Sequence, residues 1–126
     1  EGKILDVEDD DSVRDVARHM LQSAGLEVSS ADNGRSGLRE FKANSDIDLV
    51  FSDVIMPGGM TGVELATKIL EISPGLPILL ATGYAEKKLK DRLADRKNVI
   101  LMAKPHDTNE LPDLINSLML GEGKTD

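Results

Sequence analysis

Short apolar runs alternate along the chain with longer segments in which apolar residues recur at three- and four-residue steps. The short runs are rich in aliphatic and β-branched residues and predict strands, whereas the longer steps predict amphipathic helices. Five strands are expected, at residues 3–7, 26–31, 49–52, 77–81 and 99–102. Because strands and helices alternate, the pattern predicts an α/β domain with a parallel sheet and helices on both of its faces.

Five helices are expected between and after these strands. Gly25 ends the first helix, and a turn signal at residues 32–34 precedes the second. Thr61 begins the third helix with a capping box. A fourth, mostly polar helix is predicted at residues 85–94 and a fifth from about residue 109. The apolar face of the first helix is expected to contain Val13, Val16, Ala17, Met20, Leu21 and Ala24.

Polar residues stand where four of the apolar runs end. Asp53 follows the third run, Glu8 and Asp9 follow the first, Thr82 follows the fourth and Lys104 follows the fifth. In an open parallel sheet the carboxyl ends of the strands share one edge, and ligands bind there. Two carboxylates about 4 Å apart repel by roughly 4 kcal/mol at an effective dielectric constant of 20, so clustered acids indicate a cation. The pattern therefore predicts a site for a divalent cation and a phosphoryl group.

Composition narrows the classes of function. The chain has 126 residues, enough for one domain with a core and too few for two. A net charge of −8 and only three aromatic residues disfavour nucleic acid as a partner. No apolar stretch is long enough to span a bilayer, so no membrane partner is expected. The absence of cysteine fits the reducing cytoplasm.

The chain resembles the receiver domain of two-component response regulators in four motifs, which occur in order at residues 4–10, 52–57, 82–83 and 104–105. The resemblance covers almost the whole chain. It implies a single flavodoxin-like, doubly wound domain with strand order 2-1-3-4-5 and five helices. We expect the receiver domain to occupy residues 1–120 and residues 121–126 to form a tail or linker.

The resemblance also implies a role for each residue at the predicted site. Asp53 would accept a phosphoryl group from a phosphohistidine, as a regulatory phosphoacceptor and not as an enzyme. Glu8, Asp9, Asp53 and the backbone carbonyl of Ile55 would hold Mg²⁺ or Mn²⁺, ions that prefer oxygen ligands. The backbone of Ile55 would also contact the phosphoryl group.

Three further residues are expected to contact the phosphoryl group by the same resemblance. Lys104 would pair with a phosphoryl oxygen, and its bond to Pro105 is expected to be cis. Thr82 would turn its hydroxyl toward the phosphate, and Gly83 would leave room beside the backbone. The new charge would then bias the loop after Thr82 and the face formed by the fourth helix and fifth strand.

The implied partner is a histidine kinase or a histidine phosphotransfer protein. The output would lie in another domain of the same chain or in a separate protein, and the fourth helix and fifth strand offer a face for a homodimer. The loop at residues 57–62 is one residue longer than in most receivers and resembles receivers attached to hybrid sensor kinases. A stand-alone receiver and the end piece of such a kinase both remain open.

Several positions depart from the family pattern. Leu101 stands where an aromatic switch residue is common, so switching would use another element. Tyr84 either takes that role or packs at the start of a helix. Ile55 and Tyr84 are bulky at positions that govern the access of water, which predicts slow self-dephosphorylation. Asp6 lies within a strand buried on both faces, so it should be paired or protonated.

Three other functions compete with a phosphorylated receiver. A Mg²⁺-dependent phosphatase would need a second acid two residues after Asp53, where Ile55 stands. A receiver-like interaction module would lack phosphoryl transfer, although the acids, Thr82 and Lys104 argue against it. A flavodoxin-type oxidoreductase would need phosphate-binding donors, not acids, in the first loop.

Overall fold

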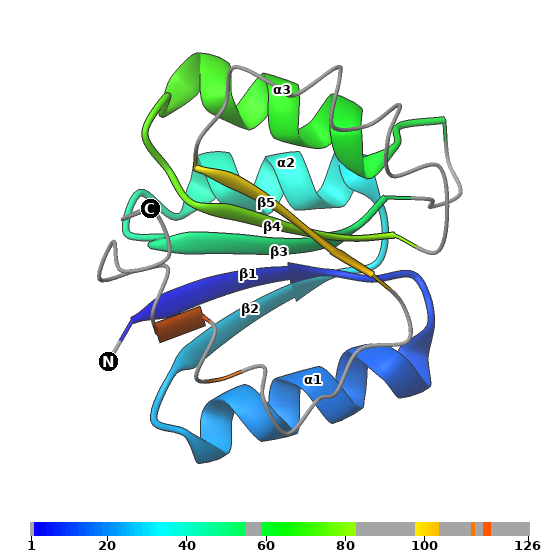
Figure 1. The fold of residues 1–126 in the computed structure, drawn as a ribbon, viewed down its shortest axis with the longest axis vertical. Coiled ribbons are helices and arrows are strands. Elements are labelled where there is room, and N and C mark those ends of the chain that lie inside the picture. The colour runs from blue at the N-terminus through cyan, green and yellow to red at the C-terminus, as the bar shows by residue number, and fades with distance from the viewer. Residues whose placement is uncertain (1, 55–58, 83–97, 104–111, 113–114, 117–126) are drawn as a thin grey trace.

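The computed structural model describes residues 2–54, 59–82, 98–103, 112 and 115–116. Five strands and three complete helices alternate along this part of the chain (Figure 1). In chain order they are β1 (Lys3–Val7), α1 (Asp11–Ser23), β2 (Glu27–Ala31), α2 (Gly34–Ala43), β3 (Leu49–Asp53), α3 (Gly62–Ile72), β4 (Ile78–Thr82) and β5 (Val99–Ala103). None of the helices described is long and apolar enough to cross a membrane.

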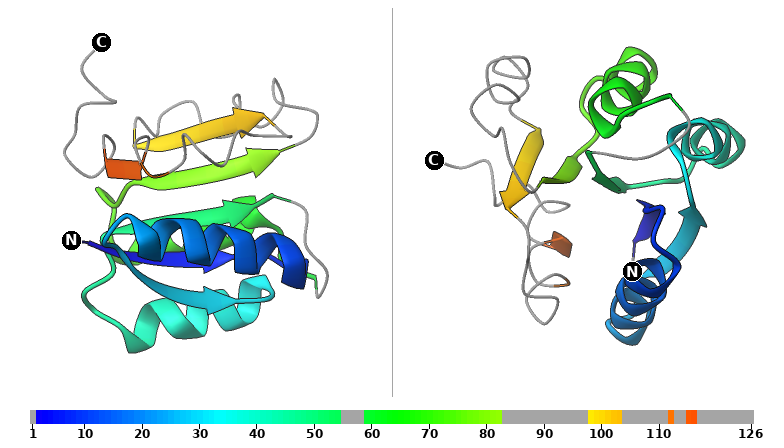
Figure 2. Two further views of the ribbon diagram at one scale, coloured as in Figure 1. Left: turned by 90° about the horizontal axis from the view of Figure 1, so that it is seen from below. Right: turned by 90° about the vertical axis from the view of Figure 1, so that its right-hand side faces the viewer.

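All four strand pairings are parallel, and the strand order is β2-β1-β3-β4-β5. Helix α1 lies on one face of the sheet, and α2 and α3 lie on the other (Figure 2). The expected doubly wound architecture and strand order are therefore confirmed. The predicted fourth helix lies outside the described residues, and of the fifth only residues 112, 115 and 116 are described.

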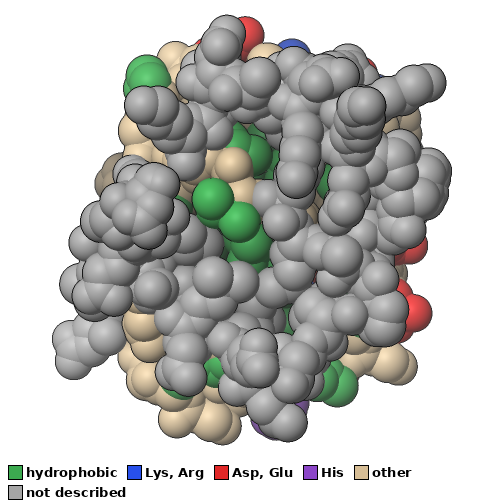
Figure 3. All heavy atoms as spheres, viewed as in Figure 1, with side chains coloured by type: hydrophobic (Ala, Val, Ile, Leu, Met, Phe, Trp, Pro, Cys, Tyr) green, Lys and Arg blue, Asp and Glu red, His purple; other side chains and the backbone are tan. Residues whose placement is uncertain are grey.

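The sheet separates two clusters of buried apolar side chains. Leu5, Val7 and Val50 pack with the inner faces of α2 and α3, whereas Ile4 and Leu49 pack on the side of α1. The fully buried Ile115 joins the cluster on the α1 side. Hydrophobic side chains are visible near the centre of the face in Figure 3, in the region of β5. The division of strand residues between the two clusters shows that successive side chains along a strand point to opposite faces of the sheet.

Three strands continue one residue beyond the predicted boundaries. β3 ends at Asp53, β4 at Thr82 and β5 at Ala103. The register explains this difference, because Asp53 pairs with Ala81 and Thr82 pairs with Ala103. The backbone ladder extends through the first residue after each apolar run. Asp53 and Thr82 are therefore held by the sheet itself and not by a loop.

The ends of the helices follow the local sequence. The Asp10 side chain accepts hydrogen bonds from two backbone N–H groups in the first turn of α1. At the other end Gly25 has a φ of 90°, and the N–H of Leu26 donates to the carbonyl of Leu21 at 3.1 Å. This arrangement is a Schellman motif, which glycine permits because it adopts positive φ without strain. The capping box predicted at Thr61 is also present.

The buried face of α1 differs from the prediction. Val13 and Val16 are 42% and 50% exposed, and Ala24 is also exposed. Only Ala17 and Leu21 are fully buried in this helix. Three other residues of the helix are half-buried: Arg14, Arg18 and Met20. Compared with the predicted orientation, helix α1 is therefore rotated about its axis, so that the side bearing Arg14 and Arg18 faces the sheet.

Candidate functional site

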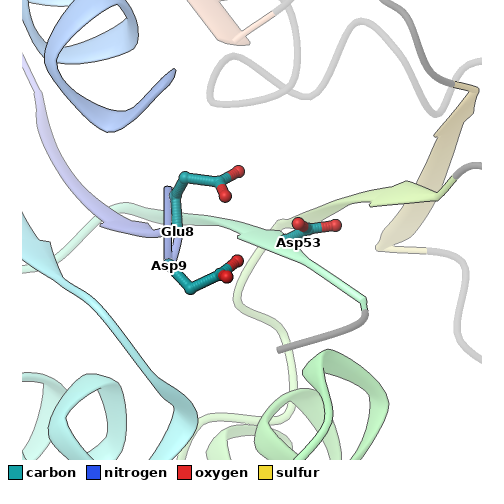
Figure 4. A group of neighbouring side chains, drawn as sticks. All are labelled: Glu8, Asp9 and Asp53. Atoms are coloured by element: carbon teal, nitrogen blue, oxygen red, sulfur yellow. The ribbon is translucent and has the colours of Figure 1, made fainter. Parts of the chain in front are cut away.

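Three carboxylates converge at the carboxyl edge of the sheet. Glu8 and Asp9 follow β1, and Asp53 ends β3, the neighbouring strand. Each residue offers an oxygen atom, and these atoms all lie within 4.8 Å of one another. Figure 4 shows the carboxylates of Glu8 and Asp9 directed toward the side on which Asp53 lies. Glu8 and Asp53 are buried, and Asp9 is exposed. The structure thus brings together the three acids predicted to bind a cation.

The turn that carries Glu8 is held by hydrogen bonds from three directions. The N–H of Glu8 donates to the carbonyl of Ala31 at 3.0 Å, which extends the pairing of β1 with β2. The N–H of Asp10 donates to the Glu8 carboxylate at 3.0 Å. The carbonyl of Glu8 accepts from Arg14 Nη1 at 2.7 Å. These bonds hold the turn in the conformation that places the Glu8 carboxylate close to those of Asp9 and Asp53.

Asp53 is positioned by the strand that precedes it and by the helix that follows. The N–H of Val54 donates to the carbonyl of Ala81 at 3.0 Å, and the Ser52 hydroxyl donates to the carbonyl of Asp53 at 2.9 Å. The N–H of Gly62, the first residue of α3, donates to the carbonyl of Val54 at 2.7 Å. Helix α3 therefore begins directly against the backbone of the candidate nucleophile.

Gly62 is a site residue that the sequence reasoning missed. A Cβ atom built at this position would lie only 2.1 Å from the carbonyl oxygen of Asp53. Only glycine allows the two backbone segments to approach this closely. The sequence did contain an indication of this role: a glycine occupies the first position of the helix, directly after the capping residue Thr61. Nearly every other residue type has a higher helix propensity than glycine, so its presence there suggests a steric reason.

The charges of the three acids make the cluster a suitable site for a cation. Two carboxylates separated by about 5 Å repel by roughly 3 kcal/mol at an effective dielectric constant of 20. A divalent cation between them would replace this repulsion with attraction. The cluster offers only carboxylate oxygens, which are the ligands that Mg²⁺ prefers. The residues present therefore fit Mg²⁺ or Mn²⁺.

A fourth acid, Asp6, lies beneath this cluster within β1. It is almost completely buried, and burial followed by repulsion from Glu8 raises the pKa of Asp6 to about 7. Its Oδ2 atom and the hydroxyl of Ser30, which faces it in the β1–β2 register, form no hydrogen bond within the part of the chain that the structure describes. Asp6 was expected to be either paired or protonated, and the raised pKa favours protonation.

The other predicted site residues are described only in part. The backbones of Thr82 and Leu101 lie in β4 and β5, but their side chains are outside the description. The remaining predicted residues lie wholly outside the described residues: Ile55, Gly83, Tyr84 and Lys104, with Pro105 and its peptide bond. Their roles stay predictions.

Solved structures of other proteins share this fold over nearly their whole length. A response regulator receiver domain protein from Clostridium thermocellum superposes with a TM-score of 0.85 and is 27% identical, covering 97% of both chains. The receiver domain of the hybrid histidine kinase CckA gives a TM-score of 0.78 with 34% identity, covering 94% of this chain and 99% of that one.

Sequence comparison leads to the same family. The response regulator receiver protein CpdR of Brucella abortus is 30% identical over 94% of this chain and 97% of its own length. Two other curated relatives are much longer, and the chain spans 22% and 24% of their lengths. A family model described as the response regulator receiver domain matches residues 4–116. Such a domain is a regulatory phosphoacceptor and not an enzyme. The chain belongs to the response regulator receiver domain family.

Proposed function

We propose that this domain takes a phosphoryl group from a phosphohistidine onto Asp53 in a Mg²⁺-dependent reaction and thereby switches conformation to control an output. The observation that carries the proposal is the convergence of Glu8, Asp9 and Asp53 at the carboxyl edge of the sheet. A receiver needs a nucleophilic carboxylate beside a cation site, and these three acids supply both.

Asp53 would act as the nucleophile. One of its carboxylate oxygens attacks phosphorus in line with the scissile bond, so an O–P bond forms as the N–P bond breaks and the electron pair passes to the imidazole nitrogen. Glu8, Asp9 and Asp53 would hold Mg²⁺, which when bound neutralises charge on the phosphoryl oxygens. The sheet holds Asp53 in place through its pairing with Ala81, so little reorganisation is needed.

The strand register supports roles for Thr82 and Lys104 at the same edge. Thr82 directly follows Ala81, the partner of Asp53, and pairs with Ala103, which directly precedes Lys104. We infer that the Thr82 hydroxyl and the Lys104 ammonium bind phosphoryl oxygens, with Gly83 leaving space beside them. The backbone of Ile55, next to Val54, would complete the contacts to cation and phosphoryl group.

The partner would be a histidine kinase or a histidine phosphotransfer protein, since receiver domains act with these proteins. Two arrangements are supported by different relatives. The likeness to the receiver domain of a hybrid histidine kinase supports a receiver that passes on or stores phosphoryl groups within such a kinase. The match to CpdR over 97% of its length supports a receiver that acts on its own.

Phosphorylation is tested with Mg²⁺ and acetyl phosphate, followed by intact mass spectrometry. We expect a Mg²⁺-dependent mass increase of about 80 Da for one phosphoryl group. Asp53→Asn should abolish it, and Asp9→Asn should shift it to higher Mg²⁺ concentrations. Asp46→Asn is the matched control, because it removes an equal charge from the opposite edge of the sheet, before β3. A protein that binds Mg²⁺ but gains no mass would instead be an interaction module.

A further inference from the structure

Within the described part of the chain, Arg14 makes two hydrogen-bonded contacts from the first turns of α1, and only one of them is a surface ion pair. Its Nη2 atom pairs with Asp11, three residues earlier in the helix. Its Nη1 atom donates to the backbone carbonyl of Glu8 at 2.7 Å. The side chain is only 17% exposed. The guanidinium therefore joins the first turns of the helix to the turn that carries the cation-binding acids.

The carbonyl of Glu8 belongs to the peptide unit that joins Glu8 to Asp9. A hydrogen bond to this oxygen fixes the orientation of that peptide plane, because the peptide unit is rigid and only its flanking dihedral angles can turn. The side chains of both acids arise from the two ends of the plane. The orientation of the plane therefore sets the directions in which Glu8 and Asp9 present their carboxylates to Asp53.

We propose that Arg14 is a positioning residue of the cation site: by binding the Glu8 carbonyl, it holds the Glu8–Asp9 peptide so that both carboxylates face Asp53. This inference rests on the proposed function of the acidic cluster. Arg14 contributes no oxygen ligand and acts through the two acids. Partners of this kind, one step removed from the ligands, commonly change metal affinity by about 10- to 100-fold when they are lost.

The geometry requires arginine at this position. A guanidinium presents several N–H donors in a fixed plane, so it can bind the Asp11 carboxylate and the Glu8 carbonyl at the same time. A lysine would keep the positive charge, but its single ammonium would not reproduce this forked arrangement. Arg14→Lys therefore separates the effect of charge from the effect of geometry.

Arg18 provides a matched control on the same helix. It pairs with Asp15 at 3.0 Å, again three residues earlier, and its side chain is 37% exposed. Both Arg14 and Arg18 are close enough to lower the pKa of Asp6 by their charge. Among the described contacts, only Arg14 reaches the Glu8 carbonyl. Arg18→Gln thus removes the same charge one turn further along and leaves the acidic turn tied to the helix.

The test measures Mg²⁺ affinity by titration, monitored by the amide NMR signals of the whole domain, for the wild type, Arg14→Gln, Arg14→Lys and Arg18→Gln. We expect Arg14→Gln to weaken Mg²⁺ binding about 10-fold or more. Arg14→Lys should lose most of the same affinity, and Arg18→Gln should stay within about twofold of the wild type. In cation-free protein, the amide signals of Asp9 and Asp10 should move in Arg14→Gln and not in Arg18→Gln.

A second measurement separates positioning from a general loss of structure. The rate of phosphorylation by acetyl phosphate should fall for Arg14→Gln at low Mg²⁺ and recover largely at saturating Mg²⁺. Equal affinity losses in Arg14→Gln and Arg18→Gln, or unmoved Asp9 and Asp10 signals, would overturn the positioning role. If the wild type binds Mg²⁺ but accepts no phosphoryl group, only the proposed function is overturned. The Mg²⁺ affinities and the amide signals of the cation-free protein do not depend on phosphorylation, so they still test the role of Arg14.

Discussion

Replacing Gly62 with alanine tests whether α3 determines the position of Asp53. The added Cβ would meet three backbone atoms: the Asp53 carbonyl oxygen at 2.1 Å, Val54 Cα at 2.9 Å and the Asp53 carbonyl carbon at 3.0 Å. Real Cβ atoms do not approach other atoms closer than 3.0 Å. The helix start and the end of β3 must therefore separate by about 1 Å, because no side-chain rotation can relieve a contact between backbone atoms.

The expected cost follows from two opposing terms. Overpacking typically destabilises a protein by about 1–3 kcal/mol, and a contact with backbone belongs at the upper end of that range. Alanine also restricts the unfolded chain, which returns about 0.4–1 kcal/mol. The free energy of unfolding should therefore fall by about 2 kcal/mol. In a domain of this size that loss lowers the midpoint of thermal unfolding by about 8 °C.

The same displacement should impair the reaction. The Asp53 carbonyl and its carboxylate belong to one residue, so a shift of the backbone by about 1 Å moves the nucleophile. A misplacement of that size can slow a positioned reaction by about a hundredfold. Phosphorylation by acetyl phosphate at saturating Mg²⁺ should therefore be slower by that order in Gly62→Ala, while the folded fraction at 20 °C stays high.

Gly75→Ala is the control substitution. Gly75 is exposed and a Cβ there meets no atom within 4 Å, so this variant should be as stable as the wild type or more stable by up to about 1 kcal/mol. Thermal unfolding by circular dichroism and the phosphorylation rate are measured for both variants. If Gly62→Ala unfolds within 2 °C of the wild type and accepts phosphoryl groups at the same rate, the close approach of α3 to Asp53 does not exist in solution.

Three further predictions concern a buried acid, a cap and the access of water. Burial raises the pKa of Asp6 from its ordinary value of 3.8 to about 7. Between these pH values the folded state holds a proton that the unfolded chain has released, so the free energy of unfolding falls as pH rises from about 4 to 7. Asp6→Asn should remove this loss. Measured by urea unfolding without Mg²⁺, the free energy of unfolding of the variant minus that of the wild type should therefore increase by about 4 kcal/mol between pH 4 and pH 8. A difference that does not change with pH would contradict the raised pKa of Asp6. Thr61→Ala breaks the capping box and should cost about 1 kcal/mol in the same urea assay at constant pH, and no measurable cost would show that the cap is not formed. Ile55→Asn should shorten the lifetime of the phosphorylated protein, measured as the loss of the added mass after acetyl phosphate is removed; an unchanged lifetime would exclude Ile55 as the barrier to water.

The alternation of parallel strands with helices and the acidic cluster could be predicted because both follow from local patterns, whereas the strand order was implied by the resemblance to receiver domains. An apolar run followed by a polar residue marks the carboxyl end of a buried strand, and parallel strands bring those ends to one edge. Glu8, Asp9 and Asp53 meet for this reason, although Asp53 comes 44 positions after Asp9 in the sequence. The predicted strands were one residue short at Asp53 and Thr82, because polarity marks where the buried side chains end and not where backbone pairing ends.

Contacts between elements could not be predicted in this way. The closeness of Gly62 to Asp53 depends on how α3 enters the domain, and the bond from Arg14 to Glu8 depends on the rotation of α1. Periodicity shows that a helix has an apolar side, but it sets the direction of that side only to within a residue or two.

The rotation of α1 explains three observations that otherwise look unrelated. The exposed Val13 and Val16 lie on the side of the helix that has turned away from the sheet. The same rotation turns the half-buried Arg14 and Arg18 toward β1, where their charges lower the pKa of Asp6 against the larger effect of its burial. It also brings the Arg14 guanidinium to the Glu8 carbonyl. An apolar stripe centred on the valines would bury more hydrocarbon, but it would leave Asp6 without a nearby cation and the acidic turn without its bond to the helix. The exposed valines are therefore the stability cost of placing Arg14 against the acidic turn and both arginines near Asp6.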